Sequence, residues 1–173
     1  LSASGALPTT RALNIFSFAT AVKSQGCNPQ HAGGERIDVS GKTYNQLRSA
    51  QWLADPGLRA FGHRSRALQI GYGFEDWEDK PVIGIINTWS DINQCHAHFP
   101  ERVQQIKKGI YQAGGFPIEL PAMSLSEPFM KPSALLYRNF LAMETEELIR
   151  TYPVDGVVLM GGCDKTTPGL LMG

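Results

Sequence analysis

The chain has 173 residues, of which 42% are apolar and 18% charged, proportions that fit a globular domain with a hydrophobic core. Lysine plus arginine and aspartate plus glutamate both number 16, so the formal net charge is zero, which argues against a nucleic-acid partner that would need a basic face. No apolar run reaches the roughly 18 residues that a membrane-spanning helix needs.

The three cysteines, Cys27, Cys95 and Cys163, are widely spaced, unlike the disulfide framework of a small secreted domain. We therefore expect a cytoplasmic protein whose thiols bind a metal or are inert. The chain starts at Leu1 rather than at a methionine and stops at Gly173, just inside a predicted helix. We expect it to be a fragment of a longer protein.

Residues 1–45 are weakly patterned and predict an N-terminal extension without a fixed fold. No acidic residue precedes Glu35, and Arg11 and Lys23 are the only charged residues among the first 34. This acid-poor, Ser-rich composition is also typical of an organellar transit peptide, in which case the protein would be mitochondrial. Cys27 lies among Gly, Asn and Pro, and nothing around it indicates a function.

Residues 46–80 combine apolar side chains with a basic cluster, and a short helix is expected near Asp55 to Phe61. The cluster consists of Arg59, His63, Arg64 and Arg66. It could contact an anionic substrate, with Arg64 as the candidate contact, but such runs are more often a solvated face.

From residue 81 onward, strand and helix patterns alternate. Apolar runs bounded by Gly and Pro predict buried strands at 81–87, 116–120 and 154–160. Helical periodicity predicts a helix from Pro100 to about Ala113 and another from Ala134 to about Arg150, capped by Ser133. In the second helix we expect Leu136, Phe140 and Met143 to face inward. The order predicts right-handed crossovers and a parallel sheet with helices on both faces, a three-layer α/β/α fold that is incomplete in this chain.

In this architecture the loops after the three strands share one edge of the sheet, where α/β proteins bind ligands. These loops carry thiols and hard oxygen donors: Asp91, Asn93, Cys95, His96, His98, Ser124, Ser126, Glu127, Cys163, Asp164 and Lys165. Thiolates select iron–sulfur clusters, zinc or copper, whereas carboxylates suit magnesium or manganese, so the mixture indicates two different metals. A zinc site made from Cys95, His96 or His98, and Cys163 is an alternative, although no close C-x-x-C pair supports it.

The last eleven residues, C-D-K-T-T-P-G-L-L-M-G, resemble the signature of the dihydroxy-acid dehydratase / 6-phosphogluconate dehydratase family of iron–sulfur hydro-lyases. The matching residues are Cys163, Asp164, Lys165, Pro168, Gly169 and Gly173. The stretch from Asn87 to His96 is similar to the first cysteine loop of that family. The loops A-G-G-F-P-I-E-L-P and S-L-S-E and the Y-R-N stretch look most like the sugar-acid (pentonate and aldonate) branch. The resemblance covers roughly residues 46–173, as the N-terminal part of the domain that binds the cluster and magnesium.

The resemblance implies a site with two metal groups. Cys95 and Cys163 match two of the three cysteines that hold a [2Fe–2S] or [4Fe–4S] cluster. Glu127, Asp164 and Lys165 match the ligands of a nearby Mg²⁺, the lysine as a carbamate. The third cysteine and the serine base lie downstream in the family, so this chain alone is expected to be inactive.

The implied reaction is dehydration of a sugar acid to a 2-keto-3-deoxy acid, by an enzyme that is a homo-oligomer when complete. His96 stands where the family usually has Asn, and it is expected either to contact the departing hydroxyl or to pack; Ser126 is a further candidate substrate contact. Dihydroxy-acid dehydratase of branched-chain amino-acid synthesis is the alternative enzyme. An inactive truncated product and the zinc-binding module are alternatives of another class.

Overall fold

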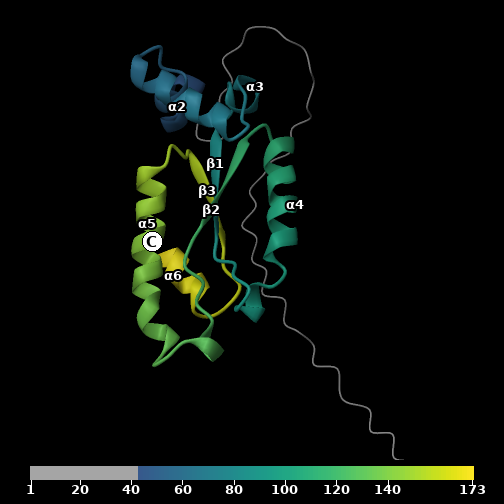
Figure 1. The fold of residues 1–173 in the computed structure, drawn as a ribbon, viewed down its shortest axis with the longest axis vertical. Coiled ribbons are helices and arrows are strands. Elements are labelled where there is room, and N and C mark those ends of the chain that lie inside the picture. Colours follow the sequence, from purple (N-terminus) through teal and green to yellow (C-terminus); the bar gives the residue numbers. More distant parts are fainter. Residues whose placement is uncertain (1–42) are drawn as a thin grey trace, which may run out of the picture. The chain divides into compact units, whose positions relative to one another are not determined.

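The computed structural model describes residues 43–173, and its centre is a three-stranded parallel sheet (Figure 1). The strands are β1 (Val82–Asn87), β2 (Phe116–Pro121) and β3 (Gly156–Met160). Their order across the sheet is β2-β1-β3, so β1 is hydrogen-bonded on both sides. All residues of β1 are buried except Ile83, which is half-buried, as expected for a central strand with both faces covered.

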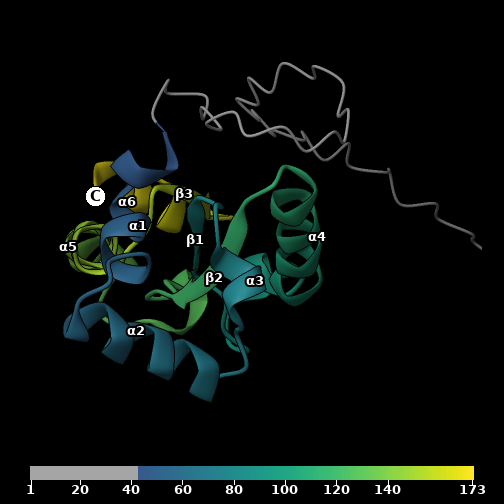
Figure 2. The same cartoon turned by 90° about the horizontal axis from the view of Figure 1, so that it is seen from above.

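Helices lie on both faces of the sheet and at the amino ends of its strands. They are α1 (Arg48–Leu53), α2 (Leu58–Gln69), α3 (Phe74–Trp77), α4 (Phe99–Gln112), α5 (Arg138–Thr151) and α6 (Thr166–Met172). Figures 1 and 2 show α4 on one side of the sheet and α5 with α6 on the other. The predicted parallel α/β/α arrangement is confirmed, and the three predicted strands agree with the observed ones to within two residues.

The two faces of β1 each build a core. Ile85 packs with Phe99 and Val103 of α4. Ile86, the next residue, points the other way and packs with residues of α5 and α6 that include Leu141. Successive side chains of a strand point to opposite faces of the sheet, so the adjacent Ile85 and Ile86 pack against helices on opposite sides.

A third core closes the amino ends of the strands. It consists of Leu53, Trp77, Val82, Phe116 and Val154. The carboxylate of Asp155 reinforces it by accepting hydrogen bonds from the backbone amides of Ser49, at 3.0 Å, and Val82, at 2.8 Å. Helix α1 is therefore attached to the sheet by buried apolar contacts and by one acidic side chain.

The prediction of which side chains of α5 face inward is wrong. Leu136, Phe140 and Met143 are 64%, 55% and 55% exposed. The helix instead buries Leu141, Ala142 and Thr145. This face contacts α6, which Gly169 allows to approach closely: a methyl group at Gly169 would lie 2.8 Å from the side chain of Leu141. The helix also starts later than expected, because Ala134–Tyr137 forms a single 3₁₀ turn.

Two further expectations concern the first half of the chain. The short helix expected near Asp55 to Phe61 is the first part of α2, which continues to Gln69. The expected N-terminal extension, with Cys27, lies almost entirely outside the described residues. Within residues 43–173, none of the helices is long and apolar enough to cross a membrane.

Candidate active site at the carboxyl edge of the sheet

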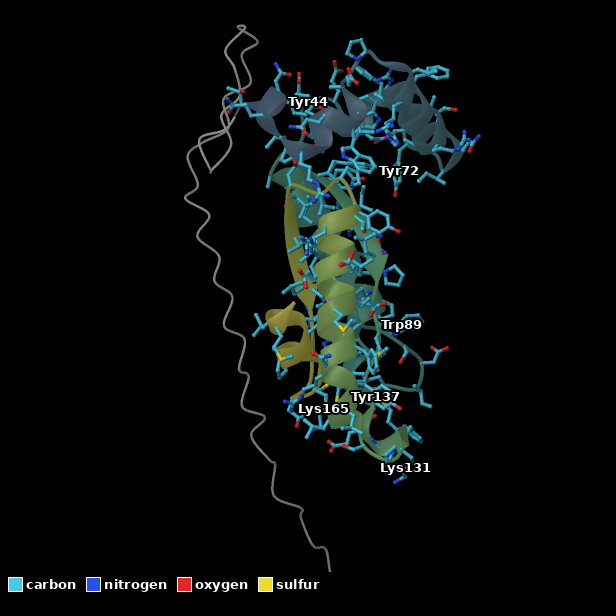
Figure 3. All side chains as sticks on the ribbon, turned by 90° about the vertical axis from the view of Figure 1, so that its left-hand side faces the viewer. Tyr44, Tyr72, Trp89, Lys131, Tyr137 and Lys165 are labelled. Carbon is cyan, nitrogen blue, oxygen red and sulfur yellow. The ribbon has the colours of Figure 1, made fainter. Side chains whose placement is uncertain are left out.

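All three strands end on one edge of the sheet, and the loops that follow them meet there. In the register of the sheet, Asn87 at the end of β1 is paired with Pro121 of β2 and Met160 of β3. We call the loops 88–98, 122–133 and 161–165 together the rim. Figure 3 shows Lys165 of the rim at one end of the molecule, and Tyr44 and Tyr72 at the opposite end.

Hydrogen bonds from the side chains of Asn93 and Ser126 hold the first two rim loops, 88–98 and 122–133, together. The amide of Asn93, which is only 1% exposed, donates to Ser124 Oγ at 3.0 Å and to the carbonyl of Leu125 at 3.2 Å. The hydroxyl of Ser126 donates to the carbonyl of Ile92 at 2.9 Å and is buried. Asn93 and Ser126 therefore connect loop 88–98 to loop 122–133. Contact of Ser126 with substrate stays a prediction.

Lys165 lies between two carboxylates that come from different loops. Its Nζ is 2.6 Å from Asp164 Oδ2 and 3.2 Å from Glu127 Oε2. Hydrogen bonds to Asp164 and then to Glu127 raise the pKa of the Lys165 ammonium, and its proximity lowers the pKa of Asp164. The three residues predicted to bind magnesium thus converge on one point, where the structure holds a positive charge.

Arg138 is a residue near this group that sequence reasoning missed. Its guanidinium donates from Nη2 to the backbone carbonyl of Asp164 at 3.0 Å. The hydrogen bond links the start of α5 to the third rim loop. The sequence signal for Arg138 was its position within the Y-R-N stretch, which does not show that the side chain reaches Asp164.

The two predicted cluster cysteines are also brought to the rim. Both are free thiols; Cys95 is exposed and Cys163 is half-buried. Partial burial raises the pKa of the Cys95 thiol, and proximity to Cys163 and Asp164 raises it further. Cys163 Sγ accepts a hydrogen bond from the backbone amide of Thr166 at 3.3 Å, one of the amides that the first turn of α6 leaves free.

His96 is fully buried between the two cysteine loops. Its ring stacks on Phe99, with ring centroids 4.5 Å apart and planes at 7°. Its Nδ1 lies 2.7 Å from the carbonyl oxygen of Thr88, and its Nε2 lies 3.1 Å from the amide nitrogen of Gly162. Both ring nitrogens of His96 thus have partners within the protein, and contact with a departing hydroxyl stays a prediction.

Arg64 is the one candidate that the structure does not bring to the rim. It lies on α2, and its Nη1 donates to the carbonyls of Leu53 and Asp55, each at 2.8 Å. It lines a cavity of about 340 Å³ that also includes Tyr44 and Trp77. This cavity lies at the amino end of the strands, the end of the molecule where Figure 3 places Tyr44.

The sequence that contains the rim loops matches a known family of enzymes. Residues 80–173, more than half of the chain, match the sequence profile described as dihydroxy-acid/6-phosphogluconate dehydratase, N-terminal. The chain belongs to the dihydroxy-acid/6-phosphogluconate dehydratase family. The family resemblance expected from the two cysteine loops is therefore confirmed.

Relatives within this dehydratase family act on two kinds of acid. The chain is 54% identical over 132 residues to 6-deoxy-6-sulfo-D-gluconate dehydratase of Pseudomonas putida, covering 76% of this chain and 23% of that protein. It is 46% identical over 128 residues to L-arabinonate dehydratase of Rhizobium leguminosarum bv. trifolii, covering 74% and 22%. It is 38% identical over 122 residues to dihydroxy-acid dehydratase of Clostridium novyi, covering 68% and 22%. The chain thus spans less than a quarter of the length of these relatives.

The donor set at the rim of this dehydratase chain fits the groups that the resemblance implies. Two carboxylates hold the Lys165 ammonium where the resemblance implies magnesium, and two free thiols lie where it implies the cluster. Within residues 43–173, no three His, Cys, Asp or Glu side chains gather closely enough to hold a metal by themselves. Magnesium would therefore need Lys165 or further ligands, and the alternative zinc site of Cys95, a histidine and Cys163 gains no support.

Proposed function

We propose that the complete protein that contains this chain is a hydro-lyase that dehydrates an aldonate to a 2-keto-3-deoxy acid, using an iron–sulfur cluster and Mg²⁺. The observation that carries the proposal is the convergence of Glu127, Asp164 and Lys165 beside two free thiols on one rim. The higher identity to the gluconate-type and arabinonate dehydratases than to the dihydroxy-acid dehydratase supports a sugar acid as substrate.

Lys165 would bind magnesium only after a change of charge. Its ammonium is stabilised by two carboxylates, and a second cation cannot share that position without repulsion. Reaction of the neutral amine with CO₂ forms an N–C bond, releases a proton and leaves an anionic carbamate. Because the contacts raise the pKa of Lys165, this reaction is disfavoured until a cation replaces the ammonium between the carboxylates.

The remaining residues hold this arrangement in place. Arg138 fixes the backbone at Asp164, and Asn93 fixes the loop that leads to Glu127. When bound, the two groups would supply Lewis acids, magnesium toward the substrate carboxylate and 2-hydroxyl and cluster iron toward the departing 3-hydroxyl. Loss of water then gives an enol, which becomes the 2-keto acid.

A substrate panel on the complete protein tests the proposal. The protein is purified without oxygen, supplied with Mg²⁺, and offered pentonates, hexonates and 2,3-dihydroxyisovalerate, with the 2-keto acid product measured as its semicarbazone. We expect turnover of at least one aldonate. Turnover of 2,3-dihydroxyisovalerate alone would instead support the dihydroxy-acid dehydratase reaction, which the similarity to the Clostridium novyi protein keeps as second candidate. No turnover of either class by protein with a full cluster would overturn both.

A further inference from the structure

The hydrogen bonds of His96 define which ring nitrogen carries the proton. Nδ1 lies 2.7 Å from the carbonyl oxygen of Thr88, which can only accept, so Nδ1 is the donor. The backbone amide of Gly162, which can only donate, lies 3.1 Å from the other nitrogen, Nε2, so Nε2 is the acceptor.

Nε2 is the end of the ring that reaches across to the second cysteine loop. It accepts from the backbone amide of Gly162 at 3.1 Å, although 66 residues separate the two in the chain. The hydroxyl of Thr166 lies 3.1 Å from the same nitrogen and 3.1 Å from Cys163 Sγ. Contacts with His96 therefore flank Cys163 on both sides in the sequence.

The position leaves no room for adjustment. A methyl group at Gly162 would lie 2.9 Å from the ring of His96 and 3.0 Å from the backbone oxygen of Cys95. Stacking on Phe99 fixes the plane of the imidazole, and Thr166 is fully buried. The His96 side chain that joins the two cysteine loops is thus held tightly in one position.

We propose that His96 is a positioning residue that couples the loop of Cys95 to the loop of Cys163, and that Thr166 carries this coupling to the sulfur of Cys163. The proposal rests on the proposed function in taking both cysteines as cluster ligands. Groups that orient metal ligands from behind change metal affinity on the order of 10- to 100-fold when they are replaced. A pair of thiols held in place before binding also loses less freedom when the cluster is bound.

Two pairs of variants separate coupling from packing. In His96→Gln the amide carbonyl can reach the position of Nε2 and accept from Gly162. In His96→Asn the shorter amide can still donate to Thr88 but does not reach Gly162. Thr166→Val removes the hydroxyl at constant size, and Thr166→Ser keeps it.

The first measurement uses the complete protein without metal. Hydrogen exchange at the Gly162 amide should be slow in the wild type and in His96→Gln, and clearly faster in His96→Asn. This readout needs no cluster, so it tests the coupling even if the protein binds no iron. Such a failure to bind iron would sink the proposed function and leave the coupling to be decided by the exchange rates.

The second measurement is the rate at which a chelator removes iron from the loaded protein. We expect it to rise about 10- to 100-fold in His96→Asn and in Thr166→Val, and to be restored to within a few-fold of wild type by His96→Gln and Thr166→Ser. A His96→Asn protein with wild-type exchange and iron release would overturn the proposal. Equal impairment of His96→Gln and His96→Asn, in step with their melting temperatures, would overturn it too, because it would show a packing role only.

Discussion

The carboxylate of Asp155 accepts hydrogen bonds from both the backbone amide and the hydroxyl of Ser49. The same carboxylate also accepts from the amide of Val82 at the start of β1. One side chain therefore joins α1 to the sheet at the end opposite the rim.

Replacing Asp155 by alanine should lower the free energy of unfolding by about 3 kcal/mol, because it leaves three donors without their acceptor. Ser49→Ala removes only one of these hydrogen bonds and should lower it by about 1 kcal/mol. Urea unfolding followed by far-ultraviolet circular dichroism measures both. Equal stabilities of the two variants would contradict the conclusion that the Asp155 carboxylate connects α1 to the sheet.

Gly162→Ala should destabilise the rim. The added methyl group would lie 2.9 Å from the His96 ring and 3.0 Å from the carbonyl oxygen of Cys95, and backbone cannot move aside as a side chain can. We expect a loss of about 1–3 kcal/mol in unfolding free energy. The matched control is Gly109→Ala, in α4, where nothing lies within 4 Å of the new methyl group. That control should raise stability by up to about 1 kcal/mol through helix propensity.

The Glu119 carboxylate makes a contribution to stability that depends on pH. Burial alone would raise its pKa, but hydrogen bonds from Lys107 and Asn87 outweigh burial and hold the pKa below its usual range. The folded state therefore binds this proton less readily than the unfolded state. The contribution is present above the unfolded pKa of about 4.3 and is lost as the pH falls through the lower folded value.

A comparison of wild type with Glu119→Gln isolates this effect. The wild type should be more stable near neutral pH by up to about 1 kcal/mol, since the pair is partly exposed. The difference should shrink as the pH falls below about 4. Thermal melts at a series of pH values measure it, with Glu147→Gln on the exposed side of α5 as control. A difference that grows in acid would contradict the ion pair.

Lys165→Ala should abolish turnover by the complete protein without removing iron. The substitution takes away the group between Asp164 and Glu127, whereas Cys95 and Cys163 are unchanged. Iron content per protein and the visible absorbance of the cluster should stay at wild-type values. Lys108→Ala, on the exposed side of α4, should retain activity. An active Lys165→Ala enzyme would refute the magnesium assignment.

Sequence was enough to predict the sheet and the meeting of the rim loops. The three strands are short apolar runs bounded by Gly and Pro, and parallel strands in one sheet must end at the same edge. The convergence of Asp164, Lys165 and Glu127 followed from that rule together with the family resemblance. Local pattern and topology were therefore sufficient for the part of the site that lies directly after strands.

Side-chain orientation could not be predicted in the same way. Both stripes of α5 contain apolar residues, and the buried one was decided by the close approach of Gly169 to Leu141, a contact between segments far apart in the chain. The role of His96 depends on Gly162 and Thr166 for the same reason. The position of Arg64 away from the rim could not be predicted, because a basic cluster in sequence gives no information about which end of the sheet it occupies.

The central place of β1 also determines when the site can form during synthesis. Translation proceeds from the amino end, so β1 and β2 can pair while β3 is still being made. Until then a nascent chain has an open strand edge on β1, and its rim has Cys95 without Cys163, Asp164 or Lys165. A chain that stalls before the third strand therefore has Cys95 at an unfinished sheet edge, without the contact that Lys165 makes with Asp164 and Glu127.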